Sequence, residues 1–109
     1  MNTYAPAQQI TITANSAITN KRFVDFNSDP CAAGTKSLGV ADDDAAAGEI
    51  LSLVTLGVAI VEAGAAITKG SAVESAAGGK AITKSTGTLN GYALDAATQA
   101  GDFIRVFLR

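Results

Sequence analysis

Short stretches of alternating apolar and polar residues recur along this chain, and they predict β-strands rather than helices. In residues 9–13, isoleucine alternates with glutamine and threonine, the pattern of a strand with one buried face. Further short strands are predicted, between turns rich in glycine and small residues, at 22–26, 38–41, 50–54, 58–61, 72–74, 80–83, 92–94 and 102–109. We therefore predict an all-β fold, a small barrel or sandwich of short strands.

Two features of these predicted strands carry further detail. Gly57 separates the predicted strands 50–54 and 58–61, which indicates a bend or a bulge between them. Alternate residues of 102–109 share a face of the sheet. One face holds Ile104, Val106 and Leu108, and the other holds Phe103, Arg105 and Phe107.

The chain also contains an internal repeat. Residues 14–19 (ANSAIT) match residues 63–68 (AGAAIT) at an offset of 49 positions. Two later matches have offsets of 52 and 53 positions: 39–41 with 91–93, and 47–49 with 100–102. The order and spacing predict two similar halves, 10–56 and 59–108, packed as a pseudo-two-fold β structure. Chance similarity within an alanine-rich sequence is the alternative.

The repeated phrase alanine-glycine-acid has a physical meaning. It places Gly48 and Gly101 in a turn directly before a strand, where glycine accepts a positive φ at little steric cost. We expect the carboxylates of Glu49 and Asp102 to lie in solvent at the mouths of those strands.

The first nine residues differ from the rest, since they are small and polar, contain Pro6 and show no periodicity. We predict that residues 1–9 form an extended N-terminal arm and that residues 10–109 form a single β domain. Tyr4 and Pro6 would allow the arm to anchor on a neighbouring chain by strand addition or by filling a pocket. A frayed terminus is the alternative.

Composition limits the chemistry that this chain of 109 residues can perform. It contains no histidine, the commonest general base and metal ligand. A single cysteine, Cys31, excludes an internal disulfide, and no histidine is present to activate its thiol. A net charge of −2 without a basic stripe argues against nucleic-acid binding. The longest uncharged apolar run, 50–61, is too short to span a bilayer, and no signal-peptide pattern precedes it, so we expect a reducing cytoplasm.

Two local motifs suggest chemistry but lack the spacing for it. The carboxylates of Asp42, Asp43 and Asp44 could bind a divalent cation, yet they lack the alternation of a calcium loop, and a solvated turn is the simpler interpretation. The run 78–80 (GGK) lacks both the hydroxyl residue and the earlier glycine of a phosphate-binding loop, so a β-turn is predicted there. We predict no cofactor and no metal site.

With these patterns in place, the chain resembles the small capsid cement (head decoration) proteins of tailed bacteriophages. The resemblance covers about residues 8 to 109, and 27–36 matches least well. It is carried by the opening strand 10–14, the segments 38–41, 47–49 and 63–73, the segment 91–97, and 100–102 with the terminal strand. These motifs are compositional and include no active-site signature.

The resemblance implies a structural protein of the virion and not an enzyme. Similar proteins bind the outside of an expanded head, commonly as homotrimers at three-fold positions, and stabilise contacts between major capsid proteins. It implies assembly in the host cytoplasm, with no cofactor and with neither nucleic acid nor a membrane as partner. Because an N-terminal arm often contacts the capsid in similar proteins, the candidate contact residues here are Thr3, Tyr4, Pro6 and Gln8.

Three alternatives remain open at this point. One is another virion component, a head–tail joining or tail protein. A second is a small-ligand-binding β-barrel, which would need a pocket lined by the few aromatic residues of the chain. The third is an enzyme that uses carboxylates such as Asp42, Asp43 and Asp44 together with a lysine.

Overall fold

The structure of the protein is a computed structural model that describes the backbone of residues 5–108 and the side chains of residues 8–108. It is almost entirely β, as predicted, and η1 (Ala77–Gly79) is a single short 3₁₀ turn. The strands are β1 (Ala5–Thr13), β2 (Phe23–Val24), β3 (Gly39–Ala41), β4 (Ile50–Glu62), β5 (Ala72–Ser75), β6 (Ala81–Thr83), β7 (Gly91–Ala93) and β8 (Phe103–Leu108).

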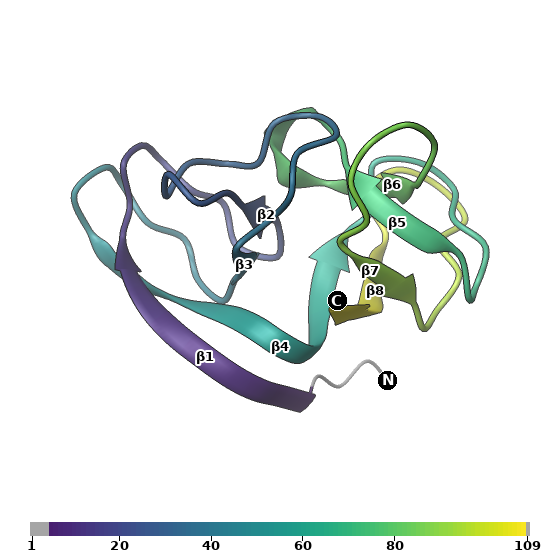
Figure 1. The fold of residues 1–109 in the computed structure, drawn as a ribbon, viewed down its shortest axis with the longest axis horizontal. Coiled ribbons are helices and arrows are strands. Elements are labelled where there is room, and N and C mark those ends of the chain that lie inside the picture. The colour runs from purple at the N-terminus through teal and green to yellow at the C-terminus, as the bar shows by residue number, and fades with distance from the viewer. Residues whose placement is uncertain (1–4, 109) are drawn as a thin grey trace.

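All the strands belong to one antiparallel sheet with the order β2-β3-β4-β8-β7-β5-β6, and β1 pairs with β4 beside this path (Figure 1). β6 returns toward the end of β4, where Ala63 and Ala81 form a bridge. There the Gly64 N–H donates to the Ala81 carbonyl at 2.8 Å. The sheet therefore curls into a nearly closed barrel over its second half.

β4 is one strand of 13 residues, not the two strands predicted at 50–54 and 58–61. Gly57 has a φ of +98°, and the register of β1 shifts opposite this position. Gly57 nevertheless pairs with Pro6 on one side and with Leu108 on the other. The glycine therefore bends the strand without ending it, and the bend is visible in Figure 1.

Backbone hydrogen bonds follow the same pattern in the two predicted halves. We call residues 10–56 half A and residues 59–108 half B. Ile18 and Ala45 exchange two backbone hydrogen bonds of 2.8 and 3.0 Å in half A, and Ile67 and Ala97 exchange two of 2.9 Å in half B. The pairing of strands repeats in the same way. The equivalent elements are β1 and the end of β4, the start of β4 and β8, β2 and β5, and β3 and β7.

Two buried clusters form the core. One lies within half A, on the face of its strands that carries Val24, Leu51 and Leu53. The other holds the equivalent residues of half B, among them Val73, Ile104 and Val106, together with Phe23, Val40 and Val54 of half A. Half B therefore covers the second face of the half A strands. In β8 the predicted alternation is confirmed, because Ile104, Val106 and Leu108 are buried.

β1 begins at Ala5, earlier than the strand predicted at 9–13. Ala5 pairs with Val58 and Pro6 pairs with Gly57, so part of the segment expected as an arm is strand. Pro6 is compatible with this position because proline, which has no N–H to donate, is tolerated in edge strands. The division into an arm and a domain at residue 9 stays a prediction.

Candidate functional site

Two of the four predicted contact residues, Pro6 and Gln8, lie in the first half of β1. Thr3 and Tyr4 are outside the described residues, and only the backbone of Pro6 is described. Gln8 is exposed, and its carbonyl accepts a hydrogen bond from the Thr55 hydroxyl at 3.3 Å. Over residues 5–108, β1 pairs with β4 alone, so it forms an edge of the sheet that another chain can approach. The role of these four residues stays a prediction.

In the repeated alanine-glycine-acid phrase, the carboxylates of Glu49 and Asp102 accept hydrogen bonds from the turns that precede them. The Glu49 carboxylate accepts the Ala46 N–H at 2.7 Å. The Asp102 carboxylate accepts the Thr98 N–H at 2.8 Å and the Thr98 hydroxyl at 2.9 Å. The Thr98 N–H bond, followed by that of its hydroxyl, lowers the pKa of Asp102. Each acid thus closes its own turn, and Gly48 and Gly101 have the predicted positive φ.

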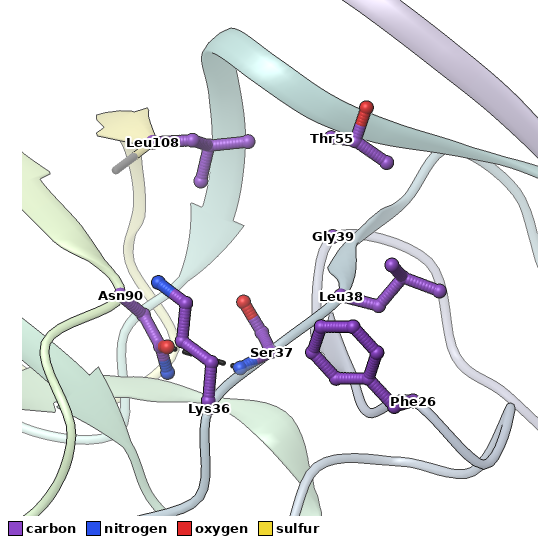
Figure 2. Close-up of a pocket in the computed structure, with 8 residues that line it drawn as sticks. All are labelled: Phe26, Lys36, Ser37, Leu38, Gly39, Thr55, Asn90 and Leu108. Atoms are coloured by element: carbon purple, nitrogen blue, oxygen red, sulfur yellow. Dashed lines mark hydrogen bonds between the residues drawn. The ribbon is translucent and has the colours of Figure 1, made fainter.

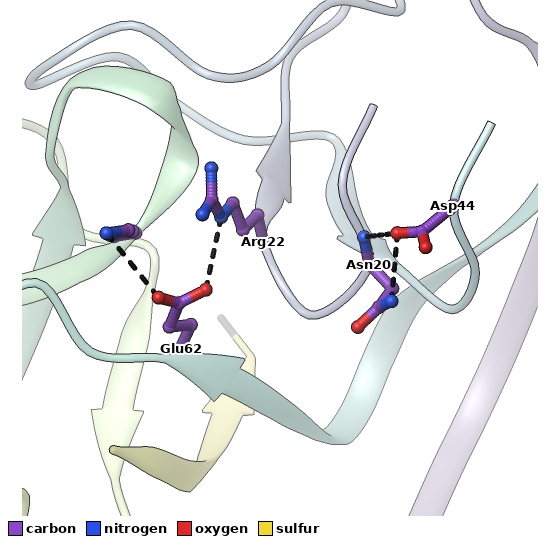
Figure 3. Close-up of polar contacts among 5 residues, drawn as sticks. Asn20, Arg22, Asp44 and Glu62 are labelled. Atoms are coloured by element: carbon purple, nitrogen blue, oxygen red, sulfur yellow. Dashed lines mark hydrogen bonds and ion pairs between the residues drawn. The ribbon is translucent and has the colours of Figure 1, made fainter. Parts of the chain in front are cut away.

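Asp44 closes a loop by accepting hydrogen bonds from Asn20. Its carboxylate accepts the Asn20 backbone N–H at 2.8 Å and the side-chain amide at 2.9 Å (Figure 3). Within residues 5–108, no three acidic, cysteine or histidine side chains gather in a way that could hold a metal ion.

A small ionic network joins the two halves. Glu62, at the end of β4, lies between Arg22 of half A and Lys80 of half B (Figure 3). Its carboxylate oxygens are 3.3 Å from the Arg22 Nε and 3.4 Å from the Lys80 Nζ. The side chains are partly buried, and every charge has an opposite partner. The network therefore links the two halves.

Equivalent acids secure the loop that follows β2 and β5. In half A, the Asp25 carboxylate accepts the N–H groups of Asn27 at 2.9 Å and Asp29 at 3.0 Å. In half B, the buried Glu74 accepts the N–H groups of Ser85 and Gly87, the latter at 3.3 Å. The Ser85 N–H is the main cause of the lowered pKa of Glu74. Both acids are structural anchors of their loops.

Cys31 is fully buried, and its thiol donates to the Thr35 carbonyl at 3.3 Å. Burial raises the pKa of this thiol. A protonated, buried thiol is a poor nucleophile, so Cys31 serves packing.

A shallow pocket of about 170 Å³ opens where half A meets half B (Figure 2). Its apolar wall includes Phe26, Leu38 and Leu108. Its polar groups already hold the two halves together. The Asn90 side chain accepts the Ser37 N–H at 3.0 Å and donates to the Thr35 carbonyl at 3.2 Å, and Lys36 donates to the Leu89 carbonyl at 3.0 Å. A single aromatic residue lines the pocket, so it lacks the aromatic lining that the small-ligand alternative requires.

Large apolar side chains at the surface are the feature that sequence reasoning missed. Their exposed fractions are 66% for Phe26, 71% for Ile50, 50% for Leu56, 39% for Tyr92 and 50% for Phe103. The alternation of 102–109 placed Phe103 and Phe107 on one face, which was a signal for part of this surface. Exposed apolar side chains indicate association with another protein where they form a contiguous patch.

A family profile described as phage cement protein matches residues 3–108. The chain belongs to the phage cement protein family. As a phage cement protein it is a structural component of the virion, associated with the phage head. No curated protein sequence matches it significantly. No helix in the described part of the chain is long and apolar enough to span a membrane.

A solved structure shares the fold of this cement protein. It is the N base of the head fiber gp8.5 of bacteriophage phi29, 22% identical in sequence, with a TM-score of 0.77. The alignment covers 94% of this chain and 93% of that chain.

Proposed function

We propose that this cement protein binds the outer surface of the expanded head as a homotrimer and stabilises contacts between neighbouring major capsid proteins. The observation that carries the proposal is the family match over residues 3–108. The base of a phi29 head fiber, which has the same fold, supports a position on the outside of the head.

The composition of the surface supports binding rather than catalysis. Several of its charged groups close turns or join the two halves, and five large apolar side chains are exposed. We propose that the protein is not an enzyme and acts without a cofactor, nucleic acid or membrane, after assembly in the host cytoplasm. Many copies on one shell make a modest affinity per copy sufficient.

The test is co-sedimentation of the purified protein with expanded and unexpanded heads of its phage. We expect saturable binding to expanded heads, with a copy number close to that of the major capsid protein. Decorated heads should then resist heat or a chelator better than bare heads. A few copies per head would indicate a joining or tail protein instead, and no binding to either form would contradict the proposal.

Thr3, Tyr4, Pro6 and Gln8 remain our candidates for the contact with the major capsid protein. Removing residues 1–9 would also remove the pairing of Ala5 and Pro6 with β4, and so would confuse folding with binding. Deletion of residues 1–4 leaves the described strand intact and is the cleaner variant. We expect weaker binding to heads, with Gln8→Ala as a milder second variant. Binding equal to that of the full chain would remove residues 1–4 from the contact.

A further inference from the structure

Half B carries an apolar face on the outside of the sheet. Directly opposed residues of paired antiparallel strands point to the same side. Tyr92 of β7 is opposite Phe107 of β8, and Phe107 is opposite Val58 of β4. Two positions along β4, Ile60 extends the same face, and its partner on β8 is the charged Arg105. Tyr92 is 39% exposed and the other three are half-buried. We call these four residues the Tyr92 face.

The repeat shows what this face corresponds to in half A. The positions equivalent to Tyr92 and Phe107 are Val40 and Val54, which are opposite each other in the same way. Both are 2% exposed, because they lie in one buried cluster with residues of half B. In half A, the row formed by Val40 and Val54 on the outer side of the sheet is therefore covered by half B. In half B, the same row has no such cover within residues 5–108.

Phe23 extends the covered row at the place where half B packs against it. Phe23 pairs with Val40 and is fully buried. The turn η1 of half B lies against it so closely that a Cβ on Gly79 would be 2.4 Å from the Phe23 carbonyl oxygen. The outer row of one repeat thus already packs against the other repeat in this fold.

Beyond that row, the two outer faces differ in chemistry. Val58 stands where half A has Gln9, and Ile60 stands where half A has Thr11. Gln9 and Thr11 are exposed, as expected for a strand that faces water. Solvent contact alone would not favour valine and isoleucine at the equivalent places. Half B has therefore kept an apolar outer face without a repeat to cover it.

We propose that the Tyr92 face is the contact between copies of this protein, and that a second copy covers it as half B covers the row of Val40 and Val54. The occupant is another copy because, among the described residues, the partner that packs on this row in half A is a repeat of the same kind. A contact between two different surfaces of identical chains closes into a ring when the rotation permits. The inference rests on the proposed homotrimer and assigns its interface.

The test introduces a charge at the centre of the face. Tyr92→Arg should weaken self-association at least about tenfold, because the guanidinium would be desolvated in an apolar contact. The double variant Val58→Gln with Ile60→Thr installs the residues that half A uses at equivalent places, and should weaken association without disturbing the fold. Ile50→Arg is the matched control, since Ile50 is 71% exposed and lies outside the face. Sedimentation equilibrium measures association in solution, and the cooperativity of the binding isotherm measures it on expanded heads.

The outcomes separate this inference from the proposed function. Association or cooperative binding by the wild type and the control, lost in both face variants, would support it. Unchanged association in Tyr92→Arg would overturn it, even if all proteins decorate heads. Loss of head binding without any association between copies would also overturn it, by showing that the capsid covers the face. If the wild type does not bind heads at all, the proposed function fails first.

Discussion

Phe23 and Ala72 occupy the same place in the two halves, and they differ because their surroundings differ. Each pairs with the residue on the neighbouring strand of its half, Val40 or Tyr92. Phe23 is fully buried under half B, whereas Ala72 is half-buried on the outer face. The two halves thus share backbone pairing, while the outer side chains follow what covers them. A repeated backbone can tolerate this divergence because the inner faces alone specify the strand register.

The largest expected effect comes from truncating a residue of half A that half B covers. Phe23→Ala, which installs the residue of half B, should lower the free energy of unfolding by about 3–5 kcal/mol, because it leaves a cavity in a packed core. Tyr92→Ala on the outer face of half B should cost under about 1 kcal/mol to the single chain. Urea unfolding at low protein concentration measures both.

Phe23→Leu keeps most of the volume and serves as a second variant if Phe23→Ala does not fold. A Phe23→Ala protein as stable as Tyr92→Ala would contradict the view that half B covers this row.

A second prediction tests whether the two backbones are truly equivalent. A Cβ on Gly39 would be 2.6 Å from the Val54 carbonyl oxygen, and a Cβ on Gly91 would be 2.5 Å from that of Phe107. Gly39→Ala and Gly91→Ala should therefore each destabilise by about 1–3 kcal/mol, and by similar amounts. Gly64→Ala is the milder comparison, since a Cβ there would meet its nearest atoms at 3.3 Å and no carbonyl oxygen closer than 3.7 Å. Urea unfolding of the three variants would expose any difference between the halves.

The sequence predicted much of this architecture because the relevant signals are local. Alternation located the strands, and the spacing of alanine, glycine and an acid located the repeat. β4 was divided wrongly, because its continuity through Gly57 depends on pairing with Pro6 and Leu108, which are distant in sequence. The early start of β1 has the same cause.

The outer face of half B could not be predicted from local patterns alone. Phe103 and Phe107 were placed on one face of the last strand, but Tyr92 and Val58 join that face only through strand pairing. Its contrast with half A also requires knowing that half B covers Val40 and Val54. The hydrogen bonds from Ser85 and Gly87 to Glu74 were not predicted, because they cross a loop that has no sequence signature.

A third prediction uses the acids that secure the loops of the two halves. Glu74 has a lowered pKa in the folded protein, so its contribution to stability is present above its ordinary pKa and is lost as the pH falls through the lowered value. Between about pH 6 and pH 3, the wild type should lose more stability than Glu74→Gln, which has no carboxylate to protonate.

Thermal unfolding across this pH range measures the difference. Ser85→Ala keeps the backbone N–H that is the main cause of the shift, and should resemble the wild type. Parallel pH curves for the wild type and Glu74→Gln would show that the Glu74 carboxylate does not anchor this loop.

The smallest expected effect concerns an ion pair found in half B. Arg105 binds the Asp95 carboxylate through two nitrogens at 3.0 and 2.9 Å, whereas half A has Ser52 at the position of Arg105. The pair is near the surface, so Arg105→Ser should lower Tm slightly, and less at high salt. Its clearer signature is the pKa of Asp95, which the hydrogen bond from the Arg105 side chain lowers to about 2.

In Arg105→Ser, the pKa of Asp95 should rise toward its ordinary value of 3.8, as followed by NMR titration of the carboxyl carbon. The positive charge of Lys69 lowers the pKa of Asp95 less than Arg105 does. Lys69→Ala should therefore raise this pKa less than Arg105→Ser. If the Asp95–Arg105 pair stabilises the fold, its contribution to the free energy of unfolding should be lost as the pH falls from about 4 toward 2. An unchanged Asp95 titration in Arg105→Ser would mean that Arg105 is held on the outer face by its neighbours and not by Asp95. The difference between the two halves at this position would then come from packing alone.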